Sequence, residues 1–215
     1  IAHFSTDLLK NYPTPVASKD LPDNLPLGNN DPNEYYVDKW ETLINPDISG
    51  VFLGAIQVSI VRRSIWCKFS ASLNIGEPYS NLDSTYPHII IYGKGLVGKK
   101  AYYIGEPFII VINGAREWMD EVPKICMVYL HEALDYYECQ GIESAQIEKC
   151  RKSLVKNNIP QVIQIFLFNN VKNIKYGFAI HYVLKYWRYM EMKVIIYNTG
   201  LSIKRWFRNK CKTPD

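Results

Sequence analysis

A short motif in the middle of the chain combines side chains that are able to bind a metal ion. His131, Glu132 and Asp135 follow the pattern His-Glu-x-x-Asp, inside a segment whose apolar spacing predicts a helix. Residues four apart lie on one face of a helix, so His131 and Asp135 would share one zinc ion. Glu132 would then act as a general base on a zinc-bound water. The motif therefore suggests the chemistry of a metal-dependent hydrolase.

This motif resembles the His-Glu-x-x-His pattern of zinc proteases, with Asp135 in place of the second histidine. A third ligand is not evident, since the remaining histidines are His3, His88 and His181. The other interpretation, which we favour, is a helix whose polar face carries the three motif residues. We therefore predict that the protein is not an enzyme and has no metal and no cofactor. The hydrolase is kept as the alternative function.

A segment rich in glycine and lysine, at 93–100, matches parts of two nucleotide-binding patterns. Its sequence, Gly-Lys-Gly-Leu-Val-Gly-Lys-Lys, contains both G-x-G-x-x-G and G-x-x-x-x-G-K. A phosphate-binding loop needs Ser or Thr where Lys100 stands, and a helix where residues 101–112 favour a strand. We therefore predict a flexible hairpin tip, at which Lys94, Lys99 and Lys100 would contact phosphate as point charges.

The charge of the chain is divided along its length. Residues 1–150 contain 12 Lys and Arg against 19 Asp and Glu, a net charge of −7. Residues 151–215 contain 13 Lys and Arg against Glu191 and Asp215 only, a net charge of +11. The two parts sum to the +4 of the whole chain. A basic region of this size is typical of proteins that bind a polyanion or an anionic membrane.

The cations of this basic third are interleaved with aromatic residues, which stack on unpaired bases in proteins that bind nucleic acid. The alternative is that these aromatic residues form part of the core. Residues 201–212 predict a short basic amphipathic helix, which would dock on its own domain, lie on an anionic membrane or bind nucleic acid. The candidate residues for binding an anion or nucleic acid are Lys94, Lys99, Lys100, Lys185, Arg188, Lys204, Arg205, Arg208, Lys210 and Lys212.

These side chains would be positioned by an α+β fold, with a mostly antiparallel sheet and two central helices. Six of the twelve prolines fall within residues 1–48, which favours an extended acidic arm ahead of a single domain at 49–215. The short basic helix would close this domain. Strands are predicted at 51–61, 64–75, 88–92, 101–104, 108–113, 162–168, 176–187 and 193–197, and the two central helices at 122–137 and 143–157.

Composition also bears on the location of the protein. No apolar stretch reaches the roughly 18 residues of a membrane-spanning helix, so no transmembrane segment is expected. The five cysteines are widely spaced and include no Cys-x-x-Cys pair, which favours a reducing compartment inside the cell or a virion, such as cytoplasm or nucleus. Because the chain begins with Ile, we expect its natural start to precede residue 1.

The sequence as a whole favours a non-enzymatic structural or assembly protein. An acidic body and a basic end would let copies of the chain associate head to tail. The basic surface would otherwise bind RNA, DNA or anionic lipid, as in a viral matrix or capsid protein or a subunit of a ribonucleoprotein. Self-association, nucleic acid and an anionic membrane all stay open as partners at this point.

Overall fold

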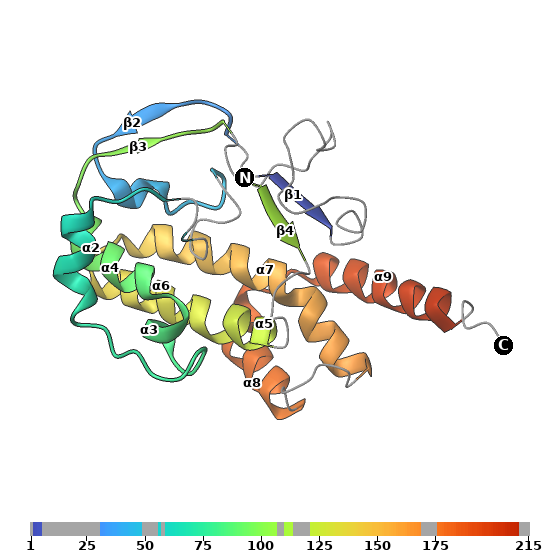
Figure 1. Ribbon diagram of the computed structural model, residues 1–215. Helices are drawn as coiled ribbons and strands as arrows, with labels where there is room; N and C mark the ends of the chain where they lie inside the picture. Colours follow the sequence, from blue (N-terminus) through green and yellow to red (C-terminus); the bar gives the residue numbers. More distant parts are fainter. Residues whose placement is uncertain are drawn as a thin grey trace, which may run out of the picture.

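The structure, a computed structural model, describes residues 2–5, 31–48, 56, 59–106, 110–113, 121–168 and 176–210. Most of these residues are helical, and their strands form two separate two-stranded sheets (Figure 1). The predicted α+β fold with a mostly antiparallel sheet is therefore wrong. Several segments rich in Ile, Val and Tyr have high strand propensity, but they form helices because tertiary burial overrides a propensity of this size.

The described strands are short and pair in two ways. β1 (Ala2–Ser5) runs parallel to β4 (Ile110–Asn113), whereas β2 (Tyr35–Val37) runs antiparallel to β3 (Ala101–Tyr103). β3 and β4 confirm two of the predicted strands. β1, β2 and the 3-10 helix η2 (Trp40–Leu43) all lie within the segment predicted as an extended arm.

Helices occupy all of residues 88–92 and the larger part of residues 64–75, two segments whose patterns predict strands. α2 (Arg63–Ser70) is followed by α3 (Leu82–Thr85) and α4 (Pro87–Leu96). α4 is buried along most of its length, so it lacks the one-sided apolar pattern that identifies a surface helix. The strand predicted at 51–61 falls mostly outside the described residues.

The first predicted central helix is confirmed. α5 (Val122–Lys124), the π-helix η5 (Ile125–Tyr129) and α6 (Leu130–Cys139) form one continuous helical segment. It ends near Gly141, whose φ of 91° lies in the left-handed region that glycine adopts without strain. The second predicted helix is α7 (Ser144–Phe168), which continues through Pro160 where the pattern predicts an end at residue 157.

The last part of the chain is helical in its described residues apart from Met190 and Glu191. α8 (Tyr176–Tyr186), the 3-10 helix η6 (Trp187–Tyr189) and α9 (Met192–Lys210) replace the strands predicted at 176–187 and 193–197. The strand predicted at 162–168 is likewise wrong, because α7 includes it. The closing helix predicted at 201–212 is only the second half of α9.

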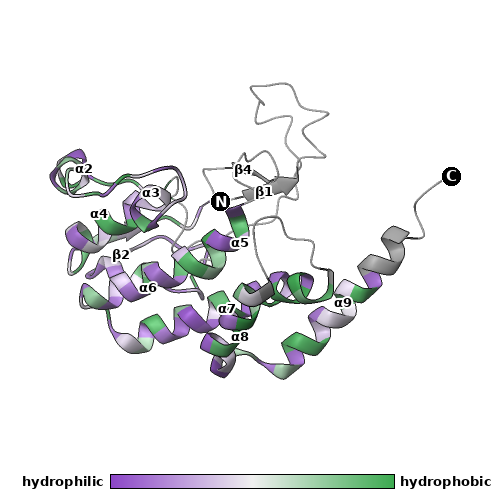
Figure 2. Cartoon of the chain, turned by 90° about the horizontal axis from the view of Figure 1, so that it is seen from below, coloured by the Kyte–Doolittle hydropathy of each residue, from purple (hydrophilic) through white to green (hydrophobic). Residues whose placement is uncertain are grey.

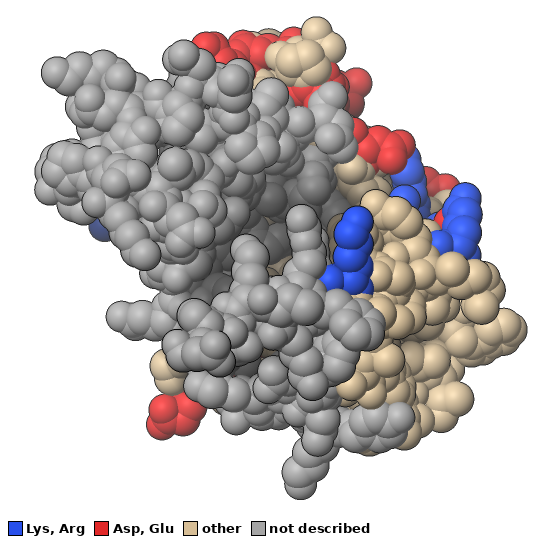
Figure 3. Space-filling model, turned by 90° about the vertical axis from the view of Figure 1, so that its right-hand side faces the viewer, with Lys and Arg blue, Asp and Glu red and all other residues tan. Residues whose placement is uncertain are grey.

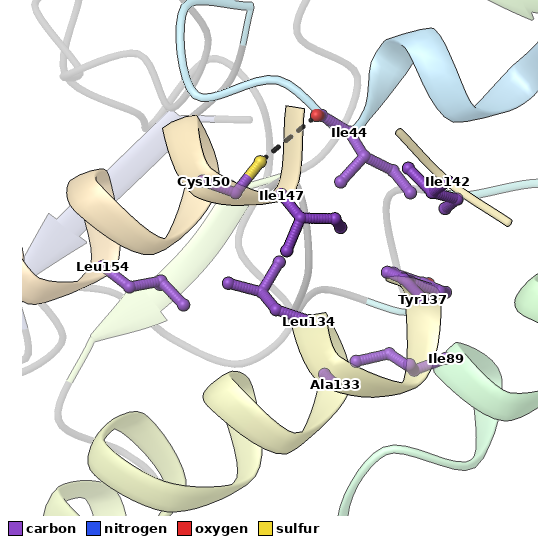
Figure 4. Packing of buried hydrophobic residues seen from close by; sticks show 9 residues of the cluster. All are labelled: Ile44, Ile89, Ala133, Leu134, Tyr137, Ile142, Ile147, Cys150 and Leu154. Carbon is purple, nitrogen blue, oxygen red and sulfur yellow. Dashed lines mark hydrogen bonds between the residues drawn. The ribbon is translucent and has the colours of Figure 1, made fainter. Parts of the chain in front are cut away.

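The core has two clusters of buried residues, and the first joins α4, α6 and the first half of α7 (Figure 4). Its buried members are Ile44, Ile89, Ala133, Leu134, Tyr137, Ile142, Ile147, Cys150 and Leu154. The Cys150 thiol donates a hydrogen bond to the Ile44 carbonyl at 3.3 Å, which ties the segment after η2 to α7. Burial raises the pKa of the Cys150 thiol to about 12, so this thiol is protonated and unreactive at neutral pH.

The second cluster joins η5, the second half of α7, α8 and η6. Its buried members are Met127, Val155, Val162, Ile165, Ala179, Tyr182, Tyr186 and Tyr189. α7 crosses the centre of the molecule in Figure 1 and contributes to both clusters, with Leu154 in the first and Val155 in the second. The orientation of α8 is therefore fixed by its packing on α7.

Candidate anion-binding face

The two faces of α8 differ in burial but not in apolar character. Its inner face contributes Tyr182 and Tyr186 to the second cluster. Its outer face carries Ile180 and Leu184, and the same stripe continues to Trp187 at the start of η6. These three side chains are 40%, 70% and 70% exposed, at the i, i+4 and i+7 spacing of one helical face.

A second exposed apolar stripe follows on α9. At about 100° per residue, Met192, Ile196 and Ile203 lie within roughly 40° of one another around the helix. All three side chains are exposed, the first two at 67%. The opposite side of α9, which includes Val194 and Leu201, is partly buried, and α9 packs against α7. The outward side of this helix is thus as apolar as its inward side.

Exposed large hydrophobic side chains are concentrated in this part of the described structure. Of the 14 such residues, eight lie between 167 and 203, although this segment is a small fraction of the chain. They are Leu167, Ile180, Leu184, Trp187, Met192, Ile196, Tyr197 and Ile203. Figure 2 shows hydrophobic residues alternating with hydrophilic ones along α8 and α9. Single exposed apolar residues are ordinary, whereas a group of this size indicates an interaction surface.

Exposed cations flank the apolar stripe of α9 but lie on another side of α8. At about 100° per residue, Lys193 and Lys204 lie roughly 60–120° from the stripe of α9, and Lys185 lies roughly 100–160° from that of α8. Lys185 on α8 and Lys204 on α9 are exposed and form no ion pair with any described residue. Lys193 is 84% exposed and lies 3.5 Å from Glu191, the sole acidic residue between 169 and 210. Lys152 also approaches Glu191, at 3.3 Å, and its hydrogen bond is the main reason why the pKa of Glu191 is lowered.

We name the exposed residues Ile180, Leu184, Lys185, Trp187, Met192, Lys193, Ile196, Ile203 and Lys204 the C-terminal face. Figure 3 looks at the end of the molecule toward which α9 points, and shows Lys and Arg at the border of a broad described surface without charged groups. The C-terminal face contains both lysines and large exposed apolar side chains.

The other cations predicted as binding residues in the C-terminal part of the chain do not belong to this face. Arg188 is engaged within the chain, since its guanidinium donates to Glu148 at 3.1 Å and to the hydroxyl of Tyr189. Arg205, Arg208 and Lys210 lie in the last turns of α9, where only their place in the helix is described. Lys212 lies outside the described residues.

The predicted hairpin tip at 93–100 is instead the end of α4 and the turn that leads to β3. Lys94 donates to the Ser72 hydroxyl at 2.8 Å, and Lys100 lies 3.4 Å from Asp38. Lys99 is exposed in the same turn. The backbone amide of Gly98 donates to the carboxylate of Glu41 at 2.8 Å, so an acidic side chain of the protein itself occupies a donor that a phosphate would need.

His131 is buried in a polar network between α6, α7 and α8. Its Nε2 lies 3.0 Å from the Tyr182 hydroxyl, and its ring stacks on Tyr186 with centroids 4.1 Å apart. Asn158 donates to the Tyr182 oxygen at 3.1 Å, which leaves the hydroxyl hydrogen of Tyr182 for Nε2 of His131. Burial lowers the pKa of His131 to about 3, helped by the positive charges of Arg151 and Lys185. The imidazole is therefore neutral at physiological pH.

The remaining motif residues do not join His131. Asp135 is about half exposed, and its carboxylate accepts a hydrogen bond from Arg151 at 2.7 Å. Glu132 is exposed, and partial desolvation raises the pKa of its carboxyl group. Within the described ranges, no group of three or more His, Cys, Asp or Glu is placed to hold a metal ion. Here His131 connects α6 to α8, and Asp135 connects α6 to α7.

Sequence reasoning missed the apolar half of the C-terminal face and the partners of His131. The signal for the face was present, because Ile180, Leu184 and Trp187 follow helical spacing. Tyr182 and Tyr186 also follow helical spacing in the sequence, and they lie one turn apart on the inner side of α8. Interpreting residues 176–187 as a strand concealed both patterns.

Comparisons of the chain with protein-family models, with curated proteins and with solved structures found no match. Within the described residues, no helix has both the length and the apolar character needed to cross a membrane. The function must therefore be argued from the chemistry of the C-terminal face.

Proposed function

We propose that the chain is a non-enzymatic structural or assembly protein whose basic C-terminal surface binds an anionic partner. The observation that carries the proposal is the exposure of Lys185 on α8 and Lys204 on α9, without an ion pair to any described residue. Cations without an ion pair attract anions most effectively, and Lys204 is the clearer case, because the charge of Lys185 also acts on the carboxyl group of Glu132. Matrix, capsid and ribonucleoprotein subunits inside a cell or virion are the classes of protein with this profile.

The distribution of charge supports an extended anionic partner rather than a single small anion. Residues 176–210 contain seven Lys and Arg against Glu191 alone, a net charge of +6, spread over two consecutive helices. Positive charges distributed over two helices fit a polymer or a surface with repeated negative charges. An acidic surface of a second copy is also an anionic partner, since residues 1–150 have a net charge of −7.

Retention on immobilised heparin tests the proposal, because heparin is a polyanion without bases or acyl chains. The double variant Lys185→Glu/Lys204→Glu should elute at clearly lower salt than the wild type. Its matched control is Lys39→Glu/Lys68→Glu, which makes the same change of net charge at exposed sites far along the chain. Each pair includes one lysine that lies over an aromatic ring, Lys185 over Tyr186 and Lys68 over Phe69.

Two results would contradict the proposal. The first is a lack of retention of the wild type at low salt. The second is equal loss of retention in both double variants, which would mean that net charge alone matters. Light scattering at low and high salt completes the test, because self-association through charge should weaken as salt rises.

A further inference from the structure

The exposed apolar side chains of the C-terminal face distinguish between the anionic partners. Phosphate groups of a nucleic acid gain little from Ile, Leu or Met, since these side chains neither donate hydrogen bonds nor stack on bases. A lipid interface interacts favourably with apolar residues and with lysines, because apolar side chains enter the acyl boundary while lysines reach the headgroups. The mixture on α8 and α9 therefore fits a lipid surface better than a nucleic acid.

The geometry of the two helices supports the same assignment. Ile180, Leu184 and Trp187 form one exposed stripe, and Met192 and Ile196 begin the next one five residues later. Lys193 and Lys204 flank the stripe of α9, as required of side chains that extend from a shallow insertion depth to the headgroups. Lys185 lies on another side of α8, where its charge also acts on Glu132 and His131 of α6. Trp and Tyr are favoured at membrane interfaces, and Trp187 and Tyr197 are 70% and 66% exposed.

We propose that the C-terminal face binds the surface of an anionic membrane, with α8 and α9 lying on the interface and not crossing it. This inference rests on the proposed function and names its partner. The lysines provide the attraction to anionic headgroups, and the apolar stripes provide the insertion. Membrane binding should require anionic lipid, because the apolar stripes are too short to hold the protein alone and a neutral bilayer offers the lysines no opposite charge.

Vesicle flotation with the full chain tests the inference. Vesicles of phosphatidylcholine mixed with phosphatidylserine should bind the protein, and vesicles of phosphatidylcholine alone should bind it weakly. The variant Leu184→Gln/Ile196→Gln should reduce partitioning onto the anionic vesicles about tenfold for each side chain that no longer inserts. The matched control, Ile60→Gln/Ile75→Gln, changes two exposed isoleucines that lie outside the C-terminal face, and it should bind as the wild type does.

Comparison with the heparin experiment separates the two proposals. Leu184→Gln/Ile196→Gln should keep its retention on heparin, whereas Lys185→Glu/Lys204→Glu should bind both heparin and anionic vesicles more weakly than the wild type. A wild type that binds heparin or RNA but not anionic vesicles refutes the membrane inference and leaves the proposed function standing. A wild type that binds neither refutes both.

The emission of Trp187 provides a measurement that does not depend on affinity. At saturating anionic vesicles, the difference between wild type and Trp187→Phe should show a blue-shifted component, because the indole leaves water. Quenching of this component by brominated lipid should follow. An unshifted, unquenched difference spectrum at saturation would show that the face does not enter the interface, and would overturn the inference.

Discussion

Acidification is expected to destabilise the folded chain through His131. In the folded state this imidazole is 1% exposed and lies against two tyrosines, so its pKa falls from the ordinary value of 6.5 to about 3. In the unfolded chain it regains the ordinary value. Above pH 6.5 the imidazole is neutral in both states and its titration contributes nothing to stability. Between 6.5 and 3 the unfolded state binds the proton and the folded state does not, so stability is lost as pH falls.

The size of this effect follows from the linkage between protonation and folding. Each pH unit below 6.5 costs about 1.4 kcal/mol of unfolding free energy while the folded imidazole stays neutral. At pH 5 the loss is therefore about 2 kcal/mol relative to pH 7.5, from this group alone. The loss stops growing near pH 3, where the folded imidazole begins to bind the proton as well.

Urea denaturation of the wild type and of His131→Gln, at several values between pH 7.5 and 5, measures the effect. His131→Gln should be less stable at pH 7.5, because it disturbs the bond to Tyr182, but its stability should fall less on acidification. His88 is also buried, yet both proteins retain it, so its effect cancels in the comparison. His181→Gln, at an exposed position on α8, is the control. Equal pH dependence in wild type and His131→Gln would refute the reasoning.

Four substitutions test the packing of the fold by chemical denaturation. Tyr182→Phe should cost about 1–3 kcal/mol, because it removes the hydroxyl that bonds to Nε2 of the buried His131 and accepts from the amide of Asn158, and a loss under 0.5 kcal/mol would contradict the network. Leu134→Ala, at a fully buried site of the first cluster, should cost about 2–5 kcal/mol, whereas Leu184→Ala on the exposed side of α8 should cost about 0.5 kcal/mol or less. Gly105→Ala should destabilise the fold by more than about 1 kcal/mol, since its methyl group would overlap the backbone of Pro32, and an unchanged midpoint would argue against this close approach.

Sequence patterns identified the central helices because their signals were local. The segment 122–137 has an apolar stripe, a proline in its first turn and Gly141 after its end, and the structure follows all three signals. α7 extends beyond the end that its pattern predicts, because Ile159 and Val162, on either side of Pro160, are buried in the core. Packing of these side chains outweighs the missing amide of the proline.

Strands were wrongly predicted where a helix is apolar on more than one side. In α4 the run from His88 to Tyr92 is wholly buried, so neither helical nor strand periodicity is visible in it. In α8 the inner tyrosines and the outer Ile180 and Leu184 together give an apolar run with β-branched and aromatic members, the composition typical of strands. The unusual outward side of α8 therefore caused the error in the fold and also concealed the apolar half of the candidate site.

The place of α7 in both clusters has a consequence for how the chain can be divided. Removing residues 176–215 would leave Val155, Val162 and Ile165 without the tyrosines that cover them, on a helix whose other half holds the first cluster together. The C-terminal face is thus not a detachable module with a self-sufficient body beside it. The same side chains that complete the interior on one side of α8 fix which residues it turns outward, so α8 cannot be deleted without exposing the second cluster, whereas single outward residues can be replaced without disturbing the core.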